Sequence, residues 1–171
     1  MSTPNVRLMA LTEAEVAACL DRTLPSVPHE IPWAEPDLVP DVVAKQVLER
    51  ARRGEDWFWC APRLFYGTEL GLMVGSGAFK NSPTNGRVEI GYGVATAHRG
   101  HGYAVAGTAL LCAEAFHRPD VAAVTAETSQ VNPASERVLL KNAFQKIGTR
   151  VDSEDGVLNC WELLRDNRRD A

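Results

Sequence analysis

The segment VEIGYGVATAHRGHGYAVAG, residues 88–107, carries the most information in this sequence. Its first half alternates apolar residues with glycine and glutamate, a period typical of a β-strand. A turn containing Arg99, Gly100 and Gly102 follows, and it leads into a run of small and apolar residues that predicts a helix over about 103–116. The segment therefore predicts a strand, a glycine-rich turn and a buried helix in direct succession.

The turn has the properties of an anion site. Backbone N–H groups at the start of a helix converge on one point, where the helix dipole is positive. Glycines let a phosphate approach the backbone closely, and Arg99 adds a positive charge. These features favour a phosphate-bearing cofactor, and a pyrophosphate fits them well. The structural alternative is a plain strand-to-helix turn, which also uses glycine.

Two other phosphate motifs are excluded. A P-loop needs Gly-Lys followed by Ser or Thr, and the sequence contains no Gly-Lys pair. A Rossmann fingerprint would have to use Gly91 and Gly93, but these lie inside the predicted strand. The acidic residue that such a fingerprint requires further on would be Glu114, in the middle of the helix.

The segments on either side extend the pattern in both directions. The sequence predicts strands over residues 6–11, 57–66, 71–80, 87–95, 121–128, 144–151 and 157–164. It predicts helices over about 13–22, from Val43 to a stop at Gly54, over 103–116, and from Pro133 to near Asn142. The order is strand, helix, helix, three strands, helix, strand, helix and two strands.

This order predicts a single α/β (α+β) domain over residues 1–171. Its sheet is mixed and mostly antiparallel, with helices on both faces. Strands 87–95 and 121–128 are joined by a crossover helix, so we expect them to be parallel. Residues 165–171 are polar and are expected to fray.

Local signals support two of the helix starts. Thr12 and Glu15 have the spacing of a capping box, with Leu11 and Val16 placed as the hydrophobic staple. Asn132 is a strong N-cap residue, and Pro133 occupies the first helical position after it. Five prolines between residues 25 and 40 forbid a regular helix there.

Composition excludes several functions. The 171 residues include 22 acidic and 18 basic side chains, giving a net charge of −4, which argues against non-specific nucleic-acid binding. The sequence has neither a run of about 20 apolar residues nor a signal peptide, so we expect a cytoplasmic protein without a membrane partner. The four cysteines have no metal-ligand spacing, so no metal site is expected.

The motifs resemble a known family. The run from Arg99 to Ala104 resembles the [Q/R]-x-x-G-x-[G/A] pyrophosphate loop of the GCN5-related N-acetyltransferases, the GNAT superfamily. Asn132-Pro-Ala-Ser135, with Val138-Leu139 and Lys141-x-x-Phe144 after it, is similar to a helix of the ribosomal-protein and small-molecule acetyltransferase branch (RimJ/RimL-like). Ile31-Pro-Trp33 resembles the proline-tryptophan loop of that branch, and the order of elements is also the GNAT order.

The resemblance implies an acetyl-CoA-dependent N-acetyltransferase, an acyltransferase that acts on a primary amine. In this family the central parallel pair of strands splays apart and acetyl-CoA lies in the gap. By position, Val94 would pair its backbone with the pantetheine arm, Asn132 would contact the pantetheine and Ser135 its thiol end. The pyrophosphate would lie on the loop formed by Arg99, Gly100, His101, Gly102, Tyr103 and Ala104. Capping alone also explains Asn132.

Glu89 is the candidate general base. Strand alternation places it with Gly91 and Gly93 on one face, and the resemblance places the family's base on this strand. An ion pair with a neighbouring strand is the structural alternative. Glu127 is the rival, either as base or as an acceptor-binding residue.

The general acid is less well defined. Many GNAT enzymes carry a tyrosine in the last helix for this role, and the corresponding position here is Leu139, which cannot donate a proton. Ser135 or water is then the candidate donor. A backbone N–H near Val94 is the candidate oxyanion donor.

The acceptor is a small-molecule or peptide amine that the sequence does not name. Trp33, in the proline-rich loop, is a candidate wall of its site, and packing against the core explains this residue equally well. The alternative to an enzyme is a CoA-binding sensor of the same fold that lacks turnover. A homodimer is compatible with the sequence.

Overall fold

The computed structural model describes residues 3–21 and 31–166. The strands are β1 (Val6–Ala10), β2 (Arg63–Gly67), β3 (Leu72–Phe79), β4 (Arg87–Val94), β5 (Ala123–Ser129), β6 (Gln145–Asp152) and β7 (Gly156–Leu164). The helices are α1 (Glu13–Leu20), α2 (Asp41–Arg52), α3 (Trp57–Cys60), α4 (Tyr103–Phe116) and α5 (Pro133–Lys141), with a short 3-10 turn over Thr96–His98.

The strands form one mixed sheet in the order β1-β2-β3-β4-β5-β7-β6. All neighbours are antiparallel except β4 and β5, and this confirms the predicted parallel pair. The parallel ladder joins only residues 87–89 of β4 to 123–125 of β5. Beyond Glu89, β4 stays paired with β3 up to Val94 but leaves β5. The two central strands therefore splay apart at the end of β4.

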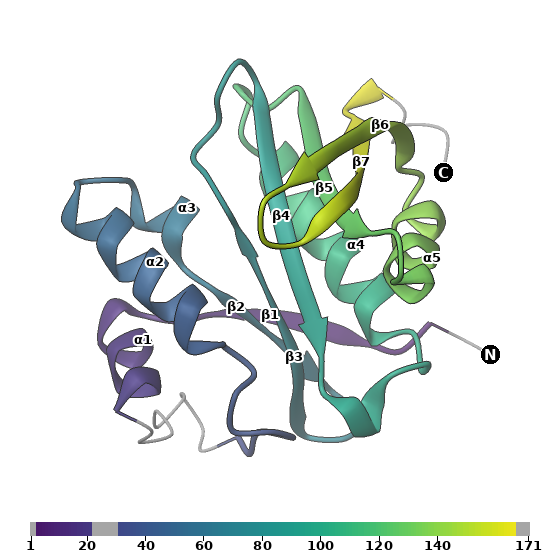
Figure 1. Ribbon diagram of the computed structural model, residues 1–171. Coiled ribbons are helices and arrows are strands. Elements are labelled where there is room, and N and C mark those ends of the chain that lie inside the picture. The colour runs from purple at the N-terminus through teal and green to yellow at the C-terminus, as the bar shows by residue number, and fades with distance from the viewer. Residues whose placement is uncertain (1–2, 22–30, 167–171) are drawn as a thin grey trace.

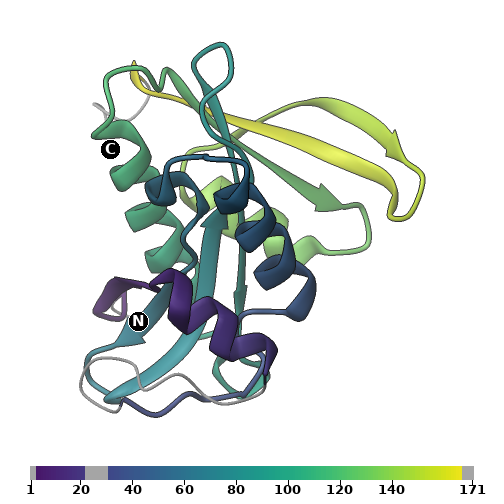
Figure 2. The same cartoon turned by 90° about the vertical axis from the view of Figure 1, so that its left-hand side faces the viewer.

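Helices cover both faces of the sheet (Figure 1). Helices α1 to α3 lie on one side and α4 and α5 on the other. Both faces of the sheet carry apolar side chains, because side chains alternate between the faces along each strand. In β2, Leu64 packs in the cluster that contains the α1 and α2 residues, whereas Phe65 packs with Leu111 of α4. Figure 2 shows the long β6–β7 hairpin at the sheet edge, reaching away from α1 and α2.

The predicted helix starts are confirmed. Thr12 accepts from the backbone N–H of Glu15, whose side chain accepts in turn from the backbone of Thr12, so the capping box is complete. The Asn132 side chain accepts from the backbone N–H of Ser135, and Pro133 begins α5. The end of the first predicted helix, at residue 22, and the prolines at 25 and 28 lie outside the described residues.

One predicted element is wrong in its first half. Residues 57–60 form helix α3 rather than the start of a strand, and β2 begins at Arg63. The Asp56 side chain caps this turn, and the buried guanidinium of Arg63 holds its end by donating to the carbonyl oxygens of Phe58 and Ala61. A run of aromatic residues has no period that reveals such a contact. The Arg63 guanidinium is also held by Glu114 of α4, whose carboxylate accepts from its Nε atom at 2.9 Å, and this partner is distant in the sequence.

Arg165, directly after the last strand, packs against the segment that follows α4. Its side chain donates to the carbonyl oxygens of Phe116, Arg118 and Val121. Residues 167–171 lie outside the described part of the chain. Over the described ranges, none of the helices has both the length and the apolar character needed to cross a membrane.

Close packing of α4 on the sheet gives a testable stability effect. A Cβ atom on Gly107 would overlap the ring of Phe65. We expect Gly107→Ala to lower the free energy of unfolding by about 1–3 kcal/mol, because overpacking outweighs the ~1 kcal/mol gain in helix propensity. Urea denaturation of the wild-type and variant proteins measures this change in the free energy of unfolding.

The matched control is Ala109→Gly on the exposed face of the same helix, which should cost about 1 kcal/mol from propensity alone. Adding Phe65→Leu to Gly107→Ala should recover part of the loss. A Gly107→Ala protein more stable than the wild type would contradict the overlap.

Candidate active site

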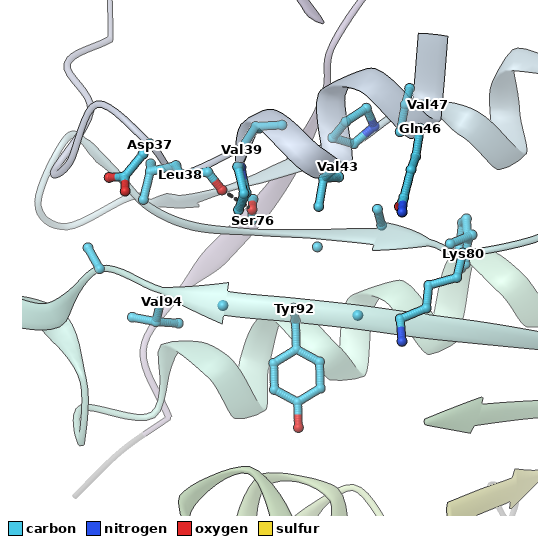
Figure 3. A pocket seen from close by; sticks show the side chains of 18 of the residues that line it. Asp37, Leu38, Val39, Val43, Gln46, Val47, Ser76, Lys80, Tyr92 and Val94 are labelled. Atoms are coloured by element: carbon cyan, nitrogen blue, oxygen red, sulfur yellow. Dashed lines mark hydrogen bonds between the residues drawn. The ribbon is translucent and has the colours of Figure 1, made fainter. Parts of the chain in front are cut away.

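Two cavities flank the end of β4. The first, of about 430 Å³, lies between β3 and β4 on one side and α2 with its preceding loop on the other (Figure 3). The second, of about 480 Å³, lies between the glycine-rich turn, the start of α4 and helix α5. Both volumes are in the range of small-molecule sites.

The two cavities meet at the splayed end of β4. Tyr92, Gly93, Val94 and Arg99 line both of them. These residues form a wall that the two cavities share. The splay leaves this segment of β4 unpaired on its β5 side, so no neighbouring strand covers it there.

The glycine-rich turn lines the second cavity, and its conformation requires glycine. Gly100 and Gly102 have φ of 78° and 88°, in the left-handed region that favours glycine. Gly102 is the N-cap residue of α4, and within the described part of the chain no side-chain oxygen caps the first N–H groups of this helix. The Arg99 Nε atom donates to the carbonyl oxygen of Val94 at 3.1 Å, which ties the turn to the end of the strand.

Helix α5 adds positive charge that the sequence did not reveal. Arg137 and Lys141 line the second cavity together with Ala134, Ser135 and Val138, and His98 lines it from the 3-10 turn. Arg137 and Lys141 are four residues apart and so share one helix face. The four-residue spacing of these two basic residues was the signal in the sequence, but basic residues on an ordinary solvent-exposed helix face have the same spacing.

A pair of hydroxyl groups bridges the splay. The Tyr92 hydroxyl lies 2.9 Å from the Oγ atom of Ser135 and also donates to the Ser135 carbonyl oxygen. Burial raises the pKa of Tyr92 above its ordinary value, so the phenol keeps its proton at neutral pH. Tyr92 was not among the predicted site residues. Its strand position predicted only that it shares a face with core residues.

A comparison with family models now bears on this geometry. Residues 5–145 match the model of the acetyltransferase (GNAT) domain. The chain belongs to the GNAT acetyltransferase family. None of the curated proteins compared with it matches the chain in sequence.

Solved structures share the GNAT fold over nearly the whole chain. An aminoglycoside acetyltransferase AAC(6')-Ib in complex with coenzyme A has a TM-score of 0.70 at 19% identity, covering 98% of this chain and 99% of that one. RimL, a ribosomal L7/L12 alpha-N-protein acetyltransferase in complex with coenzyme A, has a TM-score of 0.67 at 21% identity, covering 97% of each chain. RimJ from Mycobacterium smegmatis has a TM-score of 0.65 at 19% identity, covering 94% of this chain and 82% of that one.

Most of the expected GNAT cofactor residues line the second cavity. Val94, Arg99, Gly100, Gly102, Tyr103, Ala104, Asn132 and Ser135 all do so. His101 is exposed and is not a lining residue, and the ring of Tyr103 packs in the core with Phe65 and Leu111. Leu139 is fully buried in the core, and its neighbour Val138 faces the cavity instead. Neither side chain can donate a proton.

Glu89 lies on the face of β4 that carries Gly91 and Gly93, as the alternation predicts. Its neighbours Val88 and Ile90 are buried in the core on the other face. The Oε1 atom accepts from the Lys80 ammonium at 2.6 Å, so the ion pair with a neighbouring strand is present. The side chain is 27% exposed, and among the described residues Oε2 has no hydrogen-bond partner. Glu89 is not among the residues that line either cavity.

Glu127 is held by Arg150. The guanidinium donates to both carboxylate oxygens, with an Nη2–Oε2 distance of 2.7 Å, and also pairs with Asp152. This hydrogen bonding lowers the pKa of Glu127 below its ordinary value. A carboxylate held in this way is a weaker base.

Trp33 packs with the α1 and α2 core cluster and is not among the residues that line either cavity. The backbone of this loop forms a bridge with Met73. Glu35 and Asp37, further along the same loop, line the first cavity instead.

The Glu127–Arg150 pair predicts a pH effect. We expect Arg150→Met to raise the pKa of Glu127 toward the ordinary carboxyl value of about 4.3. The pKa is measured by carbon NMR, and the Glu127→Gln variant assigns the carboxyl resonance of Glu127. The wild-type pair contributes stability above that pH and loses it as the pH falls through the lower folded-state pKa, so the variant should be less sensitive to acid. The control is Arg52→Met, because Arg52 is an exposed residue of α2. An unchanged pKa of Glu127 in Arg150→Met would disprove the interaction.

Proposed function

We propose that this protein transfers an acetyl group from acetyl-CoA to a primary amine by direct attack in a ternary complex. The observation that carries this proposal is the meeting of two cavities at Tyr92, Gly93, Val94 and Arg99. Group transfer between two ligands needs two sites that open onto one point, with the reacting atoms held close together. Family membership supplies the reaction class.

The second cavity suits the cofactor. The unpaired N–H groups at the start of α4, the two left-handed glycines and the side chains of Arg99, Arg137 and Lys141 together favour a polyanion such as the pyrophosphate of CoA. AAC(6')-Ib and RimL structures in complex with coenzyme A support this assignment. When bound, acetyl-CoA supplies a thioester as the acetyl donor.

Glu89 is the proposed general base. It shares a strand face with Gly91 and Gly93, which line the first cavity, and among the described residues its Oε2 atom has no hydrogen-bond partner. A protonated amine must lose a proton before it attacks, and a carboxylate acting through water can accept that proton. Glu127 is less suited to this role because Arg150 occupies both of its oxygens.

Ser135 is the proposed proton donor for the departing thiolate. Ser135 lines the second cavity, and its Oγ atom is 2.9 Å from the hydroxyl of Tyr92, which lines both cavities. A protonated phenol beside it can return a proton to the serine and can orient its O–H bond. A thiolate leaves without much assistance, so positioning is the larger part of this role.

Charge reversal at the turn tests the cofactor site. We expect Arg99→Glu to weaken acetyl-CoA binding by about 10- to 100-fold, because it replaces a charge-assisted contact with repulsion. Isothermal titration calorimetry measures the affinity for acetyl-CoA. The matched control is Arg52→Glu, the same charge reversal at an exposed residue of α2. Equal affinities in wild type and Arg99→Glu would refute the assignment. Gly102→Val is a poorer test, because its φ of 88° and the Pro4 Cδ atom 2.9 Å from a Cβ would strain the turn itself.

Removal of the base tests catalysis. We expect Glu89→Gln to keep acetyl-CoA affinity and to lower kcat by about 100-fold, while Glu127→Gln retains most of the rate. Thiol release from acetyl-CoA in the presence of an amine library gives the rates between pH 6 and 9. Wild-type rates in Glu89→Gln with a loss in Glu127→Gln would assign the base to Glu127. Tight binding of acetyl-CoA with no turnover of any amine would instead identify a CoA-binding sensor.

A further inference from the structure

We infer that the acceptor is a primary amine with one positive charge on an apolar body, held in the first cavity between α2 and the β3–β4 surface. This inference rests on the proposed function, because it names the substrate class of the same site. Three features of the cavity carry it: an apolar wall, a floor without side chains and a shortage of negative charge.

The wall is apolar. Leu38 and Val39 come from the loop before α2, and Val43 and Val47 come from one face of that helix. Figure 3 shows the Val43 side chain directed from α2 toward β3. A wall of aliphatic side chains gains free energy by covering apolar substrate surface and offers nothing to a charged group.

The floor is open because glycine replaces side chains on β4. A Cβ atom on Gly93 would meet nothing within 4 Å, and one on Gly91 would approach only the Lys80 side chain. Neither residue has a positive φ, so the backbone conformation does not require glycine at these positions. The effect of both glycines is therefore the space itself, which Ala78 and Ser76 on the paired strand extend. That space accommodates the body of a substrate on the strand face that also carries Glu89.

The charges disfavour an acceptor with several ammonium groups. The cavity lining includes Arg50, Lys80 and Arg99, but Arg50 pairs with Glu55 and Lys80 pairs with Glu89. Its acidic side chains are Glu35 and Asp37, and a Glu35 carboxylate oxygen already accepts from the backbone N–H of Thr96. Among the described residues Asp37 is then the one acidic lining side chain without a partner, so a polyamine or polyamino sugar would place its additional cations beside an apolar wall without a carboxylate, at a large desolvation cost. An acceptor with one ammonium group avoids this cost.

Hexylamine and 1,6-diaminohexane test the inference, because they have the same length and differ by one charge. Their binding to the wild-type protein saturated with CoA is measured by calorimetry, and thiol release from acetyl-CoA is measured in parallel. We expect hexylamine to bind at least about tenfold more tightly than the diamine. Equal or tighter binding of the diamine overturns the inference, and so does a failure to bind hexylamine.

Variants of α2 locate the effect. Val43→Asp places a carboxylate on the apolar wall and should shift the preference at least about tenfold toward the diamine, with acetyl-CoA affinity unchanged. The matched control is Val42→Asp, because Val42 is 60% exposed and does not line the cavity. Val43→Thr, of nearly the same shape, should weaken hexylamine binding even if the Asp variant is unstable. An unchanged preference in folded Val43→Asp, or unchanged hexylamine binding in Val43→Thr, contradicts the inference.

The two readouts separate this inference from the proposed function. Selective hexylamine binding without thiol release for any amine supports the apolar acceptor cavity and refutes the transfer reaction. Thiol release with a preference for the diamine supports the transfer reaction and refutes the apolar monoamine as its acceptor.

Discussion

Strand β4 is hydrogen-bonded to β5 over three residue pairs and then leaves it, and the rest of the site depends on this separation. A continuous ladder would close the sheet and leave no passage between its two faces. Because β4 keeps its pairing with β3 to Val94, the separated segment remains fixed in space. The passage therefore has a rigid wall, which is what the alignment of two reacting ligands requires.

The two faces of the separated strand have different chemistry. On one face Gly91 and Gly93 leave empty space opposite α2, and Glu89 lies on the same face nearer the start of the strand. On the other, Tyr92 reaches across the splay to Ser135 at the start of α5. Strand alternation thus places Glu89 and Tyr92 on opposite faces of β4, three residues apart.

Helix termini complete the second cavity. The uncapped start of α4 offers N–H groups, while α5 begins with a side-chain cap and contributes Arg137 and Lys141 along one face. Both helices pack on the side of the sheet opposite α1 and α2. One face of the sheet is therefore suited to a polyanion, and the other to a smaller apolar group.

Local signals in the sequence by themselves determined both helix caps and the glycine-rich turn, because each depends on residues that are close together along the chain. The mixed sheet and the parallel pair followed from the order of the elements, because a crossover helix between two strands makes them parallel. Only the tertiary structure determined that Arg63 ends a helical turn at residues 57–60, that Arg150 occupies Glu127, that Lys80 pairs with Glu89 and that Tyr92 meets Ser135. These contacts join residues from different elements, or depend on a buried charge finding its partners, and no spacing along the chain encodes them. Packing had to bring the side chains together before burial and charge could distinguish one carboxylate or hydroxyl from another.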